Sequence, residues 1–197
     1  MKKLLVFLTV IAVGCGSSQK TASNKTENNE VVRQTTNTAE ITSPQKSIQV
    51  QKNMLVGEFE AQELQQMPFS DWFEPAYNNY KMDEKALATI KENISDYEIT
   101  IFMGTWCRDS KRETPKFIKI LDEVGYDYNK LRMIAVDRSK KMPTGIDENF
   151  EIVRVPTIIF FKDGKEINRF VEFPQESFAE DIAKIVSGKN YTNSYAR

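Results

Sequence analysis

Cys107 is the residue whose type and position most favour chemistry in this chain. It follows the mostly apolar run 97–103, which predicts a buried strand, and it precedes a run with helical spacing. Its immediate sequence is Trp106-Cys107-Arg108-Asp109-Ser110. Backbone N–H groups and the helix dipole at such a junction favour the thiolate, the form of cysteine that attacks disulfides. We therefore expect Cys107 to be a reactive nucleophile; the alternative is a buried, inert cysteine.

Ser110 limits that chemistry, because it stands where a second cysteine would complete a Cys-x-x-Cys pair. A neutral hydroxyl cannot displace the mixed disulfide that forms when Cys107 attacks, so an outside thiol must resolve it. The pattern permits a monothiol cycle with a small thiol or a partner protein. It excludes a self-contained dithiol reductase or oxidase. The alternative is that Ser110 marks a site that has lost catalysis.

The composition excludes several other classes of site. The chain has 197 residues, a formal net charge of −1 and no histidine. The charge gives no reason to expect nucleic acid as a partner, and the missing histidine removes Ser-His, Cys-His and His-metal chemistry. With Cys15 and Cys107 as its two cysteines, the chain has neither a Cys-rich metal site nor a disulfide scaffold. We expect no metal and no cofactor.

The N-terminus has the pattern of a targeting segment. The pair Lys2-Lys3 precedes an apolar run at 4–13, which is shorter than the roughly 20 residues of a transmembrane helix but suits a secretory signal. The run ends in Ala12-Val13-Gly14-Cys15, which resembles a bacterial lipobox. We predict that residues 1–15 are a lipoprotein signal peptide ending at a lipidated Cys15, which anchors the protein to a membrane of the bacterial envelope, on its periplasmic side. The alternative is an ordinary signal peptide cleaved nearby.

Composition also divides the rest of the chain. Residues 16–53 are rich in Ser, Thr, Asn, Gln, Lys and Glu, and such a segment buries too little apolar surface to offset its ordering entropy. We predict a disordered linker there. Residues 54–188 form the predicted folded domain, whose part 54–82 is an N-terminal extension. Residues 189–197 are predicted to be a C-terminal tail.

Periodicity predicts the elements of the domain. We expect helices over 83–94, 107–124 and 174–188, with Asp83 as the N-cap of the first and Pro174 at the start of the last. Strands are expected over 58–61, 99–103, 131–137, 157–162 and 167–171. An Asp163-Gly164 turn is expected to join the last two strands.

Three further groups of side chains also have predicted roles. The aromatic cluster at 69–80 is expected to pack the extension onto the sheet, with a recognition surface as the alternative. Asp109 and Glu113 are expected to lie exposed at the start of their helix. The basic run 138–141 is expected to be a solvated loop.

Several features, in this order, resemble the thioredoxin family. They are Trp106-Cys107-x-x-Ser110, Pro115, the strand that ends at Asp137, and Val155-Pro156-Thr157 leading into Phe160-Phe161-Lys162-Asp163-Gly164-Lys165. The resemblance covers roughly 84–188. It implies a thioredoxin-like α/β fold, with a mixed central sheet and helices on both faces.

The resemblance also implies roles for single residues. It makes Cys107 the nucleophilic cysteine, Trp106 the aromatic residue before it, and Pro156 the cis-proline that faces the thiol. We also expect Trp106, Arg108, Val155 and Pro156 to lie on the surface that binds a partner.

Envelope-anchored bacterial relatives share a similar Trp-Cys-x-Asp-Ser stretch, and this chain resembles that subgroup. The predicted function is that of a lipid-anchored, monothiol thioredoxin-like protein in thiol–disulfide exchange or redox homeostasis of the envelope. Its predicted partners are thiols or disulfides of proteins or small molecules. The alternative is a catalytically inactive binding module that holds a partner protein. Ile101 bears on this choice, because it stands where the family often has a buried acid that helps to move a proton.

Overall fold

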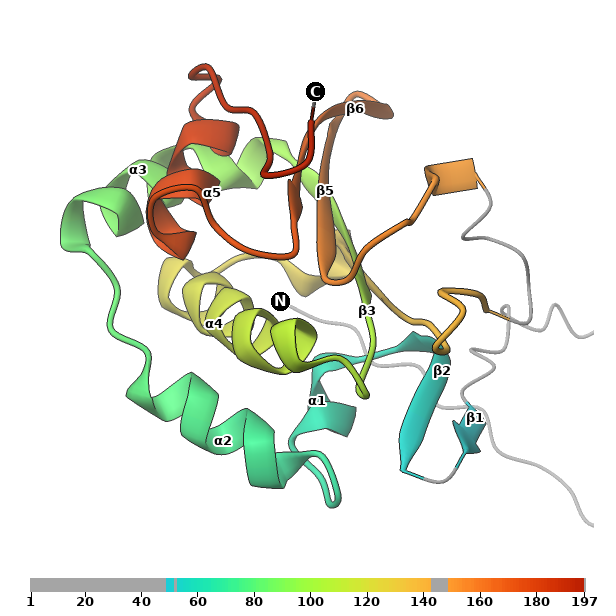
Figure 1. Ribbon diagram of the computed structural model, residues 1–197. Helices are drawn as coiled ribbons and strands as arrows, with labels where there is room; N and C mark the ends of the chain where they lie inside the picture. The colour runs from blue at the N-terminus through green and yellow to red at the C-terminus, as the bar shows by residue number, and fades with distance from the viewer. Residues whose placement is uncertain (1–48, 52, 143–148, 197) are drawn as a thin grey trace, which may run out of the picture. The chain divides into compact units, whose positions relative to one another are not determined.

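The computed structural model describes residues 49–51, 53–142 and 149–196 (Figure 1). The predicted signal peptide with Cys15, and most of the predicted linker, lie outside these residues. The strands are β1 (Gln49–Gln51), β2 (Met54–Phe59), β3 (Glu98–Met103), β4 (Leu131–Ala135), β5 (Thr157–Lys162) and β6 (Lys165–Val171). The α-helices are α1 (Ala61–Leu64), α2 (Ser70–Asn79), α3 (Glu84–Asn93), α4 (Arg108–Val124) and α5 (Phe178–Val186). Two short 3₁₀ helices are η1 (Ile94–Asp96) and η2 (Tyr128–Lys130).

The strands form one mixed sheet in the order β1-β2-β4-β3-β5-β6. Strands β3 and β4 are parallel and are joined through α4, whereas the other neighbours are antiparallel. This arrangement confirms the strand–helix–strand unit and the hairpin that the sequence predicts. The thioredoxin-like α/β fold expected from the resemblance is thus the fold observed.

The two faces of the sheet are covered by different kinds of structure. On one face, Ile101 and Phe160 pack with Phe117 of α4 and Phe178 of α5, and Figure 1 shows α2, α3, α4 and α5 all on that side. The other face carries a smaller cluster, in which Phe102 contacts Phe150. Among the described residues, its cover comes from the β4–β5 connection, including a helical turn at 149–150. The long helices therefore lie on one face, where helices on both faces were expected.

Local signals set most of the element boundaries, with several differences. Strand β2 runs over Met54–Phe59 and not over 58–61, and β6 begins two residues before the expected start. Asp83 caps α3 as predicted, and its side chain accepts a hydrogen bond from the Ala86 amide at 2.8 Å. Helix α5 begins at Phe178 and not at Pro174, because Ser177 caps it by accepting from the Glu180 amide. Strand β4 ends at Ala135, two residues short of the expected end. Strand β1 lies inside the stretch predicted as linker, because backbone pairing with β2 needs no apolar side chains.

The extension contacts α4 in addition to the core. Phe69 and Phe73 are buried in the main cluster, and the Tyr77 hydroxyl donates to the Asp122 carboxylate of α4 at 2.7 Å. This contact and burial raise the pKa of Tyr77 to about 12, with desolvation as the larger cause. The aromatic cluster at 69–80 therefore has a packing role, and it fixes α2 against the helix that carries the cysteine motif (Figure 1).

The segment after α5 returns across the domain. Tyr191 is buried and its hydroxyl donates to Asp181 at 3.2 Å, while Asn168 of β6 donates to the Tyr191 carbonyl at 3.1 Å. The predicted tail 189–197 is thus packed on the domain over its described part, and it brings Tyr195 close to the cysteine motif.

Candidate functional site

Cys107 lies at the junction that the sequence predicts, as the N-cap residue of α4. Its side chain is partly exposed and caps no amide of the helix. The Cys107 amide donates to the Gly104 carbonyl at 2.9 Å, and its carbonyl accepts from the Lys111 amide at 3.1 Å. The first amides of a helix have no acceptor within the helix and carry the positive end of its dipole. The sulfur therefore lies next to the positive end of the helix dipole.

The loop before β5 faces this sulfur. Cys107 Sγ donates to the Val155 carbonyl at 3.2 Å, and the Val155–Pro156 peptide bond is cis, the conformation that the resemblance implies. Trp106, Cys107 and Val155 line one hollow of about 370 Å³. The structure thus brings together residues some fifty positions apart in the sequence. This is expected for a site that the segment around Cys107 shares with the loop before β5.

Ser110 is completely buried beneath the start of α4. Its hydroxyl oxygen accepts a hydrogen bond from the Gly104 amide at 3.1 Å. The loop is also held from β2, because the Leu55 amide donates to Thr105 Oγ1 at 3.1 Å. Ser110 therefore supports the backbone of the loop that carries Cys107. The Leu55–Thr105 contact joins the N-terminal extension to this loop.

Trp106 is fixed in place from three sides. Its indole N–H donates to the Val136 carbonyl at 2.9 Å, and the guanidinium of Arg138 lies 5.5 Å from the centre of the ring. A Cβ atom at Gly104 would come within 2.6 Å of the ring, so this position requires glycine. Trp106 is thus a rigid wall of the hollow next to the sulfur.

The charged residues of the first two turns of α4 differ from expectation in one respect. Arg108 is exposed, as a partner-binding residue would be. Asp109 is partly exposed and pairs with Arg112 at 2.6 Å. Glu113 was expected to be exposed, but only 1% of its side chain is accessible, and it pairs with Arg112 and, at 3.0 Å, with Lys116. Helical spacing explains the burial, because position 113 shares the inward face of α4 with Ser110.

Three residues that sequence reasoning missed meet beside the hollow: Arg154 and Glu172 line it, and Tyr195 packs against them. Arg154 donates to the Glu172 carboxylate at 3.0 Å, and its guanidinium lies 3.9 Å from the centre of the Tyr195 ring. The Tyr195 hydroxyl also bonds to Glu172, and this hydrogen bond raises the pKa of Tyr195 above its usual value. The three come from separate segments, each without a motif, so the sequence offers no signal that would group them.

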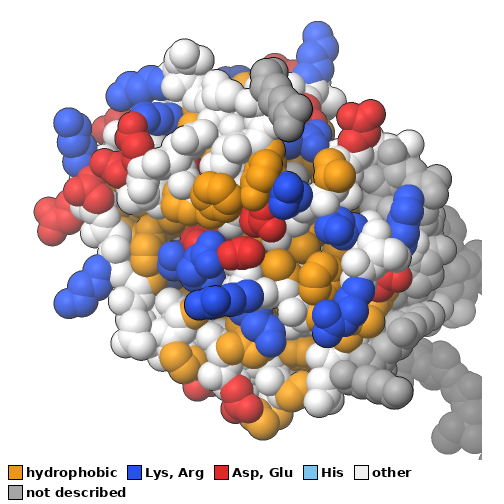
Figure 2. All heavy atoms as spheres, in the orientation of Figure 1, with side chains coloured by type: hydrophobic (Ala, Val, Ile, Leu, Met, Phe, Trp, Pro, Cys, Tyr) orange, Lys and Arg blue, Asp and Glu red, His pale blue; other side chains and the backbone are white. Residues whose placement is uncertain are grey.

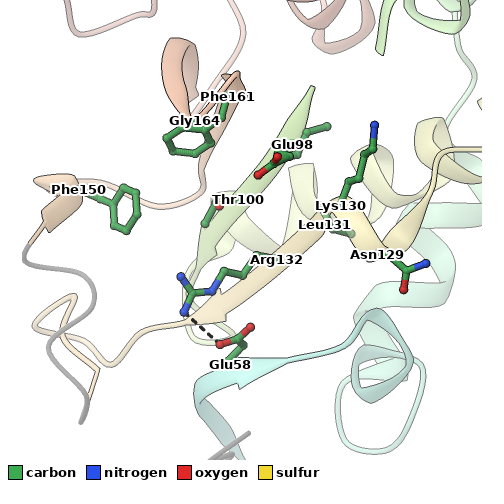
Figure 3. A pocket seen from close by; sticks show the side chains of 11 residues that line it. Glu58, Glu98, Thr100, Asn129, Lys130, Leu131, Arg132, Phe150, Phe161 and Gly164 are labelled. Atoms are coloured by element: carbon green, nitrogen blue, oxygen red, sulfur yellow. Dashed lines mark hydrogen bonds and ion pairs between the residues drawn. The ribbon is translucent and has the colours of Figure 1, made fainter. Parts of the chain in front are cut away.

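A larger hollow of about 660 Å³ lies elsewhere, on the sheet face opposite the long helices (Figure 3). Thr100 and Phe161 form part of its lining, and Figure 3 shows the Glu58–Arg132 ion pair at its edge, with 3.1 Å between the charged atoms. Its lining contains no cysteine, so the nucleophile belongs to the smaller hollow.

Metal-binding clusters and membrane-spanning helices are both absent from the described part of the chain. No group of three or more acidic or cysteine side chains there is placed to hold a metal ion. No helix within 49–51, 53–142 and 149–196 combines the length and the apolar character needed to cross a membrane.

The mixed sheet, the helix that Cys107 precedes as N-cap and the facing cis-proline loop define an α/β protein with a thiol site. The family model described as Thioredoxin matches residues 81–184, which is more than half of the chain. The chain therefore belongs to the thioredoxin family, and this membership points to thiol–disulfide redox chemistry with thiol or disulfide substrates.

Individual thioredoxins are similar to parts of the chain. It is 34% identical over 92 residues to a thioredoxin of Staphylococcus saprophyticus, covering 46% of this chain and 83% of the relative. This chain is also 31% identical over 108 residues to a thioredoxin of Staphylococcus epidermidis, a match that covers 50% of this chain and 98% of the relative. The crystal structure of oxidised thioredoxin O2 from Arabidopsis thaliana is similar over 46% of this chain and 74% of that one, with 20% identity and a TM-score of 0.31.

Proposed function

We propose that this protein performs thiol–disulfide exchange with Cys107 as its single nucleophile, anchored by lipid in the bacterial envelope. The observation that carries the exchange chemistry is the position of the Cys107 sulfur, which is partly exposed at the N-terminus of α4 and 3.2 Å from the Val155 carbonyl. Cys107 is the one cysteine of the described residues, and Ser110 occupies the position of a second sulfur.

The reaction then has two exchange steps. The Cys107 thiolate attacks one sulfur of a substrate disulfide; a new S–S bond forms, the old one breaks, and the leaving thiolate takes a proton from water. An outside thiol, from a small molecule or a partner protein, next attacks the substrate sulfur of the mixed disulfide; a new S–S bond joins the two, and the Cys107 thiolate leaves. No net oxidation of the protein occurs, and no second cysteine of the chain is required.

The surroundings assign supporting tasks to neighbouring residues. Trp106 forms one side of the hollow. The backbone at Val155 has polar groups with which an extended substrate segment forms hydrogen bonds. Arg108 presents a cation beside the sulfur on the exposed side of the helix. Ser110 holds the loop by accepting from the Gly104 amide.

The rate at which Cys107 reacts tests this proposal. In the full chain carrying Cys15→Ala, Cys107 is the only thiol. We expect it to form a mixed disulfide with uncharged dithiodipyridine at pH 7 at least about tenfold faster than the same chain unfolded in urea, because the partly exposed sulfur lies at the positive N-terminal end of α4. Adding Cys107→Ser should abolish the adduct. A folded rate equal to or below the unfolded rate would overturn the exchange proposal.

The second candidate function is a binding module that uses the same hollow without catalysis. The observation that favours it is Ile101, which is completely buried in the apolar core where the family often has an acid. No carboxylate is present at that position to assist proton transfer. Slow reaction of Cys107 in the test above would support this alternative.

The lipid anchor rests on the sequence alone, because Cys15 lies outside the described residues. We expect that Cys15→Ala, expressed in a bacterial host, releases the protein from the membrane fraction or leaves the precursor uncleaved. Cys107→Ser is the matched control, since it changes the other cysteine and should leave the protein membrane-bound. A normally processed, membrane-bound Cys15→Ala variant would contradict the anchor.

A further inference from the structure

The charges around Cys107 are unevenly paired. Among the described residues, the cations Arg108, Arg138 and Lys140 have no carboxylate partner within ion-pair distance. The nearby acids do have partners: Asp109 pairs with Arg112, and Glu172 pairs with Arg154 and accepts from Tyr195. The surroundings of the sulfur therefore present cations that nothing in the described chain neutralises.

A rigid turn holds two of these cations at the site. The Asp137 carboxylate accepts from the Ser139 amide at 2.8 Å, the Ser139 hydroxyl at 2.6 Å and the Lys141 amide at 2.9 Å. These hydrogen bonds lower the pKa of Asp137, and the bond from the Ser139 hydroxyl has the largest effect. The turn directs Arg138 to the Trp106 ring and Lys140 into the lining of the Cys107 hollow. The basic run 138–141 is a mostly exposed turn, in agreement with the expected solvated loop, and it also brings Arg138 and Lys140 next to the site.

Apolar surface accompanies the charge. Val153 lines the same hollow and is 76% exposed. Figure 2 shows Lys and Arg side chains beside hydrophobic and acidic ones in the middle of the visible face. A partner that suits this surface has carboxylates near its reacting sulfur and apolar groups beside them.

We infer that the Cys107 site selects an extended polypeptide segment whose disulfide sulfur is flanked by acidic side chains. The inference rests on the proposed function and names its substrate class. Arg108, Arg138 and Lys140 attract the carboxylates, while Val153 contacts apolar side chains of the segment. The exchange itself proceeds as above: a bond forms between Cys107 and the peptide sulfur, and the second sulfur leaves as a thiolate.

Three synthetic peptides test the selection. They share one sequence and one cysteine activated as a mixed disulfide with thiopyridine, and they differ only in carrying Glu, Gln or Lys at the flanking positions. With the full chain carrying Cys15→Ala at low ionic strength, we expect the Glu peptide to react roughly tenfold faster than the Lys peptide. About 0.5 M salt should remove most of that difference. The increase in reaction rate should be smaller for oxidised glutathione, a free anionic disulfide, than for the Glu peptide, because glutathione lacks the extended segment.

Charge variants locate the effect. Lys140→Gln and Arg138→Gln should each lower the Glu-to-Lys rate ratio by about threefold, whereas Lys91→Gln, on the distant helix α3, should leave the ratio unchanged. Equal rates for all three peptides would overturn the inference and leave the exchange proposal intact. An unchanged ratio in both site variants would also overturn it, as would a gain for glutathione as large as for the Glu peptide. Failure of every peptide to react would instead overturn the proposed function.

Discussion

Ser110→Cys is expected to convert the site from one that needs an outside thiol into one that resolves its own adducts. Position 110 is one helical turn from Cys107 on α4, so the added sulfur can attack the mixed disulfide at Cys107 and release the substrate thiol. A dithiol reductant would then reopen the internal disulfide. Before any reductant is added, we expect the variant to release both halves of a model disulfide and to form its internal disulfide, whereas the original chain keeps one adduct for each Cys107.

Thiol counting and a matched variant make this measurement decisive. After mild oxidation, Ser110→Cys in the Cys15→Ala chain should contain no free thiol. Ser110→Ala removes the hydroxyl without adding sulfur; it leaves the Gly104 amide without its acceptor and should cost about 1–2 kcal/mol of stability with no gain in turnover. If Ser110→Cys retains two free thiols under oxidation, the Cys107 sulfur is out of reach of position 110. The serine is then not the reason why the site needs an outside thiol.

Local patterns in the sequence were sufficient for the elements that carry the site. The apolar run before Cys107 and the helical spacing after it predict β3 and α4. The Asp163-Gly164 turn predicts the β5–β6 hairpin, in which both residues have positive φ. These features depend on contacts between residues close in sequence, so a single sequence reveals them.

The coverage of the sheet could not be derived in the same way. Strands β3, β4 and β5 carry apolar side chains on both faces, such as Ile101 and Phe102 in β3. Such a pattern shows that both faces are covered, but it does not identify the cover. On the second face, Phe150 and Met142 of the β4–β5 connection contribute to the cover of the sheet. Their positions show no helical periodicity from which this role could be predicted.

The rim of the hollow was missed for a related reason. Arg154, Glu172 and Tyr195 meet only because the loop before β5, the end of β6 and the C-terminal segment converge in space. Each is an ordinary polar residue in its own segment. The burial of Glu113, in contrast, could have been found, because Phe117 follows it by four positions on the same inward face of α4.

Glu113→Ala is expected to give the second large effect, a loss of about 2 kcal/mol in the free energy of unfolding. The buried carboxylate accepts charged hydrogen bonds from Arg112 and Lys116, and hydrogen bonds to charged groups contribute roughly 1.5–3 kcal/mol. Removing a partner from a fully buried pair costs more than this. Here, 41% of the Arg112 side chain and 23% of the Lys116 side chain are accessible, so water can solvate the cations that remain.

Asp109→Ala provides the matched control, because Asp109 pairs with the same guanidinium but 31% of its side chain is accessible. An exposed pair contributes between about 0 and 1 kcal/mol, and added salt screens it. Urea unfolding of both variants should therefore show a clearly larger loss for Glu113→Ala, and that loss should change little between low and high salt. Equal losses would mean that burial does not strengthen the Glu113 pairs. In that case the start of α4, and with it the Cys107 sulfur, is held mainly by the Gly104–Ser110 and Leu55–Thr105 hydrogen bonds.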